Sequence, residues 1–181
     1  MIAENIAALR ADIREVAVRN GRNPDGILLV AVSKTFDAGA IREALQAGVF
    51  DYGENYVQEL LEKRSVLSDP RLRWHFIGHL QTNKVKYVVD TVHLIHSLDS
   101  VRLAAELEKR GALSGRTIDV LVEVHTTDEA TKYGVPPDET LELVRQVARF
   151  ERVKVRGLMT MGPFSDDPNA SRPSFRLLSE L

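Results

Sequence analysis

Strand-like and helix-like patterns alternate along this chain, and the alternation limits its fold more than any other feature. Short apolar runs predict strands, and apolar residues at helical spacing between them predict helices. The predicted strands cover 27–33, 49–52, 73–77, 92–96, 117–124 and 153–158. After an opening helix over 2–20, the predicted helices cover 37–47, 54–67, 82–89, 99–112, 138–149 and 172–181. Repeated βα units of this kind predict a parallel sheet with helices outside it.

A barrel fits these units better than an open dinucleotide-binding sheet. No Gly-x-Gly-x-x-Gly follows the first predicted strand, and no Walker-type Gly-Lys-Ser/Thr is present. We therefore predict one α/β domain over 1–181, a (β/α)8 TIM-barrel type. A complete barrel has eight units and about 250 residues, so the six units counted here leave two missing. Asp37 is expected to cap the start of one helix, and Gly111 to mark the end of another.

Composition excludes several classes of function. The 26 acidic and 24 basic residues nearly balance, so no net field favours nucleic acid or an anionic membrane as a partner. The chain has no cysteine, which excludes a disulfide framework, a thiolate metal site and a cysteine nucleophile. The N-terminus does not resemble a signal peptide, and no apolar stretch approaches the roughly 20 residues of a membrane helix. We expect a soluble cytoplasmic protein; its oligomeric state stays open.

The first predicted strand ends in a lysine. The apolar run from Ile27 to Ser33 is typical of a strand buried on both faces, and Lys34 comes directly after it. A partly desolvated amine in such a place is more readily available as the neutral nucleophile that a Schiff base requires. A lysine at a strand end is also often a plain surface residue. The residues at the ends of the other strands decide between the two interpretations.

Polar or sulfur-bearing side chains lie at the ends of the other predicted strands. Among them are Asn55, His79, Ser97 and Met159. In parallel α/β folds the chemistry collects at the carboxyl ends of the strands. Taken singly, Asn55 could cap the following helix, and His79 could be an ordinary loop histidine. Their coincidence with Lys34 favours a functional interpretation.

Metal binding and serine catalysis find little support in the sequence. His75 and His79, like His93 and His96, have spacings that suit a helix, but they fall on predicted strands or strand ends. Those spacings do not form one coordinating face there, so we expect no metal site. No Gly-x-Ser-x-Gly is present, which removes the usual sign of a serine hydrolase.

Three segments carry a specific resemblance to a known family. Ala31-Val32-Ser33-Lys34-Thr35, the run DYGENYVQE over 51–59 and the run WHFIGHLQTNK over 74–84 resemble the pyridoxal-5'-phosphate homeostasis proteins, the YggS/PROSC family. Lys132-Tyr133-Gly134 and the run RGLMT over 156–160 extend the match. The resemblance covers essentially the whole chain in the right order.

The resemblance implies a barrel similar to the N-terminal domain of alanine racemase, with pyridoxal 5'-phosphate bound as a covalent aldimine on Lys34. By the same matching, Asn55, His79, Ser97 and Met159 would face the cofactor. The implied role is that of a carrier or regulator in intracellular vitamin B6 homeostasis and amino-acid metabolism, without catalysis of its own. Pyridoxal-phosphate-dependent apoenzymes are the implied protein partners.

The family pattern also contains segments beyond those found in these 181 residues, including the ones that hold the cofactor phosphate. Their absence agrees with the two missing units, and backbone donors around a phosphate are a main anchor of such cofactors. We therefore expect the 181-residue chain on its own to bind pyridoxal phosphate weakly.

Two enzyme functions remain as alternatives. A pyridoxal-phosphate-dependent racemase of the alanine racemase type needs an acid/base group on the face opposite the lysine. Only Tyr52 and Tyr56 flank a predicted strand end, and the second domain that supplies this tyrosine in alanine racemase is absent. A Schiff-base aldolase acting on a sugar phosphate is the other alternative, and the run over 74–84 argues against it.

Overall fold

The computed structural model describes residues 1–127, 129, 133–167 and 169–181. They divide into two compact units, Met1–His75 and Phe76–Leu181. Lys132, part of one matched motif, lies outside the described residues. Within the described ranges, no helix is long and apolar enough to cross a membrane.

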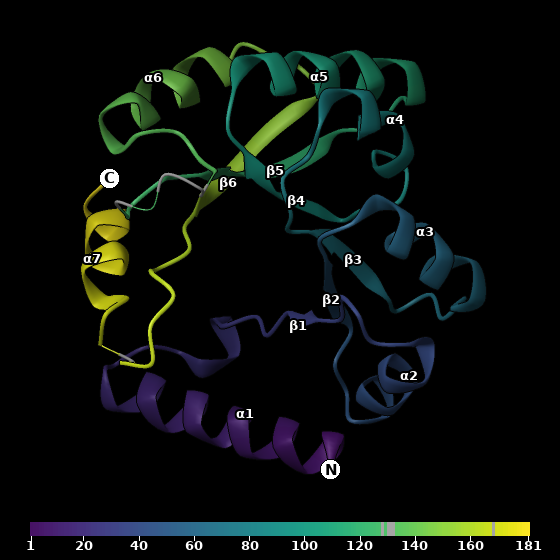
Figure 1. Ribbon diagram of the computed structural model, residues 1–181, viewed down its shortest axis with the longest axis vertical. Helices are drawn as coiled ribbons and strands as arrows, with labels where there is room; N and C mark the ends of the chain where they lie inside the picture. Colours follow the sequence, from purple (N-terminus) through teal and green to yellow (C-terminus); the bar gives the residue numbers. More distant parts are fainter. Residues whose placement is uncertain (128, 130–132, 168) are drawn as a thin grey trace. The chain divides into compact units, whose positions relative to one another are not determined.

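The first unit contains two βα steps after an opening helix, and most of strand β3 follows them (Figure 1). Strand β1 pairs in parallel with β2, with Ala31 opposite Tyr52. The Arg73 N–H donates to the Phe50 carbonyl at 2.8 Å, which sets the start of β3 beside β2. These strands and helices match the predicted ones in order. Their bounds are α1 Ile2–Arg19, η1 Pro24–Gly26, β1 Ala31–Val32, α2 Ala38–Gln46, β2 Asp51–Glu54, α3 Val57–Val66 and β3 Arg73–Phe76.

Local contacts stabilise both the helices and the strands of this unit. The Asp37 carboxylate accepts a hydrogen bond from the Ala40 N–H at 3.0 Å, which confirms the predicted cap of α2. Tyr52 is buried in β2 and its hydroxyl donates to the Val49 carbonyl at 2.8 Å. The ring of Trp74 in β3 packs against Tyr52, with centroids 5.9 Å apart. An apolar core therefore backs β2 and β3.

The first strand is shorter and less buried than predicted. Only Ala31–Val32 form β1, within the predicted 27–33. Leu28 is 57% exposed and Val32 is 47% exposed, so the prediction of burial on both faces is wrong. The physical reason is that β1 has one paired neighbour, β2, among the described strands, and its other edge is not covered by a strand.

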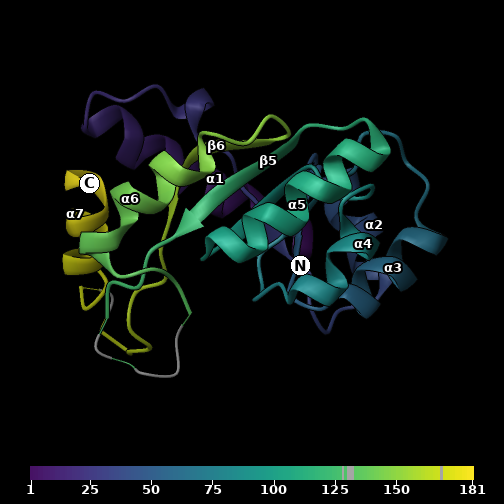
Figure 2. The ribbon, with the colours of Figure 1, turned by 90° about the horizontal axis from the view of Figure 1, so that it is seen from above.

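The second unit continues the alternation with a parallel set of strands (Figures 1 and 2). Strand β5 pairs in parallel with both β4 and β6, and Val120 lies opposite Ile95 and Val155. Helices α5 and α6 pack against each other and against β6. The bounds are η2 Thr82–Lys84, α4 Val85–Val88, β4 Leu94–Leu98, α5 Val101–Ser114, β5 Ile118–Glu123, α6 Pro137–Val147, β6 Val153–Met159 and α7 Arg172–Glu180.

Two details of the second unit correct the predictions. The helix predicted over 82–89 divides into the 3-10 turn η2 and the short helix α4. Gly111 does not end α5, because the helix continues to Ser114 and ends at Gly115, whose φ is 68°. Gly111 serves packing instead: a β-carbon there would lie 2.9 Å from the Arg116 carbonyl oxygen.

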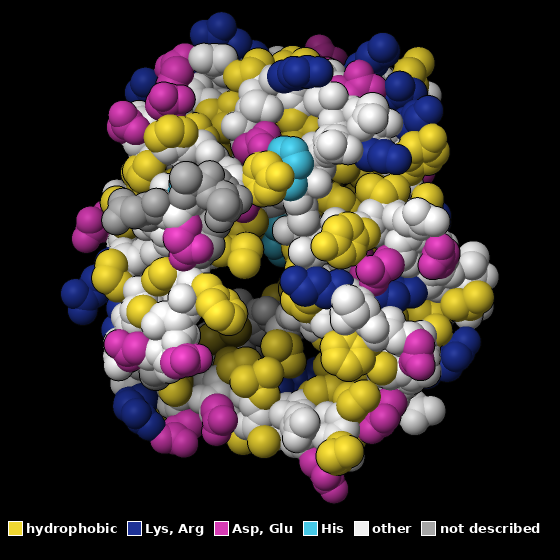
Figure 3. Space-filling view, viewed as in Figure 1, with side chains coloured by type: hydrophobic (Ala, Val, Ile, Leu, Met, Phe, Trp, Pro, Cys, Tyr) yellow, Lys and Arg dark blue, Asp and Glu magenta, His cyan; other side chains and the backbone are white. Residues whose placement is uncertain are grey.

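Charged side chains are mixed on the surface. On the face in Figure 3, Lys and Arg side chains are interspersed with Asp and Glu side chains. This distribution agrees with the near balance of 26 acidic and 24 basic residues.

Candidate cofactor-binding site

Lys34 occupies the corner of a tight turn at the end of β1. The Ser33 N–H donates to the Gly53 carbonyl at 3.0 Å and extends the parallel pairing one residue past the strand. The Phe36 N–H then donates to the Ser33 carbonyl at 3.1 Å, which closes a four-residue turn with Lys34 and Thr35 at its centre. Thr35 has a φ of 67°, in the left-handed region that β-branched residues rarely adopt. The backbone around Lys34 is therefore strained and tightly specified.

The side chain of Lys34 is free for chemistry. It is exposed, so the predicted desolvation of this amine is not found. No hydrogen bond or ion pair joins it to any residue that the structure describes. An aldehyde can approach this amine without first displacing a protein partner.

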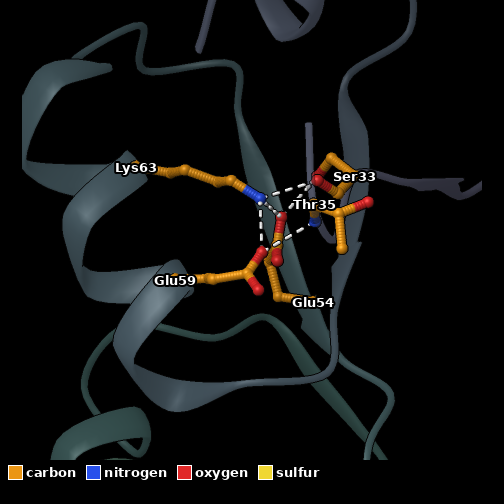
Figure 4. A network of polar contacts seen from close by, with 5 residues as sticks. All are labelled: Ser33, Thr35, Glu54, Glu59 and Lys63. Atoms are coloured by element: carbon orange, nitrogen blue, oxygen red, sulfur yellow. Dashed lines mark hydrogen bonds and ion pairs between the residues drawn. The ribbon is translucent and has the colours of Figure 1, made fainter. Parts of the chain in front are cut away.

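A polar cluster whose Ser33, Glu54 and Lys63 side chains are buried holds the residues on both sides of Lys34 (Figure 4). We call it the Lys63 cluster, and its members are Ser33, Thr35, Glu54, Glu59 and Lys63. The Lys63 ammonium donates to the Ser33 carbonyl at 2.6 Å, to Glu54 Oε1 at 2.7 Å and to Glu59 Oε2 at 3.1 Å. The Ser33 hydroxyl donates to Glu54 Oε1 at 2.6 Å, and the Thr35 N–H donates to Glu59 Oε2 at 2.9 Å.

Charge pairing allows the charged side chains of this cluster to be buried. Lys63 is 8% exposed and Glu54 is fully buried, and buried charges are costly unless they are paired. The hydrogen bond from the Thr35 N–H, followed by that from Lys63, lowers the pKa of Glu59 and favours its charged form. The second oxygen of Glu54, Oε2, is buried and has no hydrogen-bond partner in the described part of the chain.

Asn55 lies directly after β2, next to the turn that carries Lys34. Helix α3 has Tyr56 as its N-cap residue, so the alternative that Asn55 caps this helix is wrong. Its Oδ1 is buried and has no partner within the described ranges. Because β1 and β2 are paired and parallel, the structure brings Lys34 and Asn55 to the same edge of the first unit.

Ser97 and Met159 lie on separate strands of the second unit. Ser97 falls inside β4, which extends to Leu98, and is fully buried. Its hydroxyl oxygen has no hydrogen-bond partner among the residues that the structure describes. Met159 is the last residue of β6 and is half-buried. Strand β5 lies between β4 and β6, so these two residues are not on neighbouring strands.

His79 contacts an aromatic and an acidic side chain of the second unit. Its ring stacks on Tyr133 with centroids 3.9 Å apart and an angle of 12° between the planes. Its Nδ1 lies 3.4 Å from Asp99 Oδ2. These three residues line a pocket of about 720 Å³, together with Asn83 and Arg102 among others.

Several polar groups near strand ends were not among the predicted site residues. His125 Nε2 and Thr127 Oγ1 come after β5, and both atoms are buried without a partner in the described part of the chain. Burial, and then the charge of Asp99, raises the pKa of Glu123 at the end of β5 to about 7. The sequence shows that His125 and Thr127 follow a predicted strand, but only the fold shows that these two atoms are buried without a partner among the described residues. Within the described ranges, no group of three or more His, Asp or Glu residues could hold a metal ion.

The fold belongs to a known class. The family described as the alanine racemase N-terminal domain matches residues 5–180. Alanine racemase of Clostridium difficile has a similar structure, with a TM-score of 0.70 and 14% identity over 93% of this chain and 46% of that one. The chain therefore has the α/β, TIM-barrel-type fold of this class, as predicted.

Closer relatives define the family within this class. The pyridoxal phosphate homeostasis protein of Aquifex aeolicus is 44% identical over 178 residues, which cover 98% of this chain and 78% of the relative. That of Pseudomonas aeruginosa is 39% identical over 180 residues, 99% of this chain and 78% of the relative. PipY of Synechococcus elongatus, solved with pyridoxal phosphate bound, is 33% identical with a TM-score of 0.80, covering 99% of this chain and 83% of PipY. The chain belongs to the pyridoxal phosphate homeostasis protein family, which confirms the resemblance found in the sequence.

Proposed function

We propose that this protein binds pyridoxal 5'-phosphate through Lys34 and acts as a carrier or regulator in intracellular vitamin B6 homeostasis, without catalysis of its own. The observation that carries the proposal is the free, exposed amine of Lys34 on a turn braced from both sides. The family membership supports it, and so does the pyridoxal phosphate bound in the related PipY.

Buried polar atoms at the strand ends suit such a ligand. The Oδ1 of Asn55 and the hydroxyl of Ser97 have no partner among the described residues, and a buried polar atom normally has one. The Asn55 Oδ1 atom is an acceptor, and the phenolic O–H or a protonated pyridine nitrogen of pyridoxal phosphate can donate to it. The Ser97 hydroxyl can donate to the phenolic oxygen or to the phosphate. We assign Asn55, His79, Ser97 and Met159 as cofactor-contacting residues, and residues 1–181 as one cofactor-binding domain.

The proposed linkage is an imine between the lysine and the aldehyde. The Nζ atom of Lys34 attacks the aldehyde carbon, a carbon–nitrogen double bond forms and one water molecule leaves. No oxidant or reductant is required. Only the neutral form of an amine is nucleophilic, and the exposed position of Lys34 leaves its Nζ atom accessible to the aldehyde.

The racemase alternative is less well supported by the tyrosines of the first unit. The Tyr52 hydroxyl is buried and donates to the carbonyls of Ile41 and Val49. Burial, followed by the charge of Asp51, raises the pKa of Tyr52 to about 12. This hydroxyl is poorly suited to act as a base near neutral pH, because it stays protonated there. Tyr56 is 60% exposed and is the tyrosine to test.

Borohydride reduction of the mixed protein and pyridoxal phosphate tests the linkage. Reduction converts an imine into a stable pyridoxyl adduct, and peptide mass spectrometry is expected to find it on Lys34. Lys34→Arg keeps the positive charge and is expected to lose the adduct. An adduct spread evenly over the surface lysines would contradict the proposal.

Incubation with either enantiomer of alanine tests the absence of catalysis. With pyridoxal phosphate added, we expect no interconversion above that of the cofactor alone. Interconversion that disappears in Lys34→Ala would establish the racemase alternative, and its loss in Tyr56→Phe would identify the second acid/base group.

A further inference from the structure

The Lys63 cluster contacts both neighbours of Lys34 but leaves the Lys34 side chain out. We propose that Lys63, Glu54 and Glu59 are positioning residues that fix the turn around Lys34 and so direct its amine toward the aldehyde. This inference rests on the proposed function and adds to it the residues that make Lys34, among the lysines of the chain, the one that reacts.

The residue before Lys34 is held at every polar group. The Ser33 N–H donates to Gly53 of β2, and its hydroxyl donates to Glu54 at the end of the same strand. Its carbonyl accepts from Lys63 of α3 at 2.6 Å as well as from the Phe36 N–H across the turn. Strand β2 and helix α3 therefore both fix Ser33, and together they set the direction of the backbone that leads into Lys34.

The residue after Lys34 is held in an unfavourable conformation. Thr35 has a φ of 67°, and such a residue persists only where its surroundings fix it. Its N–H donates to Glu59 Oε2 at 2.9 Å, and Glu59 is paired with Lys63 one helical turn further along α3. The strain lies next to the proposed reactive amine, where a specified geometry has a use.

Lys63 is the element that joins the two halves of the cluster. Its ammonium contacts Glu54 and Ser33 on one side and Glu59, which holds Thr35, on the other. It is also a second amine close to the turn, but it is 8% exposed and paired with two carboxylates. A paired, buried ammonium cannot attack an aldehyde, so the cluster removes Lys63 from competition and leaves Lys34 free.

Strand β2 supplies a matched control for a purely structural role. Asp51 starts the strand and Glu54 ends it, and they are 3% and 0% exposed. The Asp51 carboxylate accepts hydrogen bonds from Arg73, and its Oδ1 lies 3.0 Å from His75 Nε2. These contacts are made at the start of β2, and the Lys34 turn is at the other end of this strand. Asp51→Asn and Glu54→Gln therefore each remove one buried carboxylate charge from β2, but only the second affects the turn.

The test compares reaction at Lys34 with the stability of the ligand-free chain. Each variant is mixed with pyridoxal phosphate, and the imine absorbance, the rate of its appearance and the fraction of Lys34 trapped by borohydride are measured. Lys63→Met and Glu54→Gln are expected to slow trapping at Lys34 at least tenfold. The rate of trapping at Lys34 in Asp51→Asn is expected to stay within twofold of that in the unmodified chain. This holds even where the melting temperature of Asp51→Asn falls as far as that of Glu54→Gln. Lys63→Arg, which keeps the charge and the donors, is expected to recover part of the rate.

Milder variants keep the test decisive if Lys63→Met does not fold. Glu59→Gln retains an acceptor for the Thr35 N–H but loses its charge, and Glu59→Leu loses both, so trapping is expected to fall in that order. Trapping that follows melting temperature alone across all variants, Asp51→Asn included, would overturn the positioning role. An unmodified chain that forms no adduct on Lys34 even at a large excess of pyridoxal phosphate, which compensates for weak binding, would instead overturn the proposed function. The two failures are therefore distinct.

Discussion

The guanidinium of Arg73 forms two hydrogen bonds with the carboxylate of Asp51, one of them 2.7 Å long, and joins the first residues of β3 and β2. His75 Nε2 lies 3.0 Å from the same carboxylate. Burial acts to raise the pKa of Asp51, but the hydrogen bonds and charges of Arg73 and His75 outweigh it and the pKa is lowered. The carboxylate is thus a structural anchor at the opposite end of β2 from the Lys34 turn.

Asp51→Asn is expected to lower the free energy of unfolding at pH 7 by about 1–3 kcal/mol, because hydrogen bonds to a charged group are lost. A carboxyl group with a lowered pKa in the folded state stabilises above its unfolded pKa, and this contribution disappears as pH falls through the folded pKa. The difference between the two chains should therefore shrink below about pH 4. Urea unfolding from pH 3 to 7 measures it. A difference that is constant over this range would contradict the assignment.

Lys34→Ala is expected to abolish the pyridoxyl adduct while it changes the free energy of unfolding by less than about 0.5 kcal/mol. The reason is that the Lys34 side chain is exposed and has no partner among the described residues. Mass spectrometry after borohydride reduction and a urea titration of the ligand-free chain measure the two effects. A large loss of stability would show that this side chain has a structural role.

Thr35→Gly is expected to raise the free energy of unfolding by up to about 1 kcal/mol. Glycine avoids the cost of about 1–2 kcal/mol that a β-carbon incurs at this φ of 67°. Its greater freedom in the unfolded chain offsets part of this gain, because it destabilises the folded state by about 0.5–1 kcal/mol. Thr35→Ala is the control, because alanine keeps the β-carbon and should bring no such gain. Thermal unfolding of the two variants measures the difference, and equal melting temperatures would argue against strain at Thr35.

Glu123 gives stability an unusual dependence on pH. Its pKa is raised from 4.5 to about 7, so between these values the unfolded chain ionises while the folded chain keeps the proton. The free energy of unfolding therefore falls as pH rises through this window, by about 1.36 kcal/mol per pH unit and by up to about 3 kcal/mol in all. Above the window this contribution is constant. Glu123→Gln should remove this slope, which urea unfolding at pH 4.5 and 8 measures. A slope that survives the substitution would contradict this assignment.

The order of elements could be predicted from the sequence because each strand and helix has a local apolar pattern. Every predicted strand has a counterpart in the structure, and Lys34 comes after β1 as expected. The burial of residues 27–33 could not be predicted correctly, since an apolar run does not show whether a strand has one paired neighbour or two. The prediction that Gly111 ends a helix was wrong, because glycine is favoured both at a helix end and at a point inside a helix where other atoms approach closely.

The Lys63 cluster could be predicted only in part. Glu59 and Lys63 have the spacing of an ion pair along a helix, which the sequence displays. That this pair faces Ser33 and Thr35 depends on how α3 packs against the turn, and this tertiary contact leaves no periodic pattern. Asn55 was predicted correctly as a strand-end residue, although its orphaned oxygen becomes visible only in the structure.

Trp74 gives the protein a built-in optical probe. It is the one tryptophan of the sequence, it is 4% exposed, and it packs against Tyr52 in the unit that carries Lys34. Its emission is expected to shift to longer wavelength when that unit opens, whereas circular dichroism responds to helices throughout the chain. The two signals recorded together distinguish local opening around the first three strands from unfolding of the whole protein.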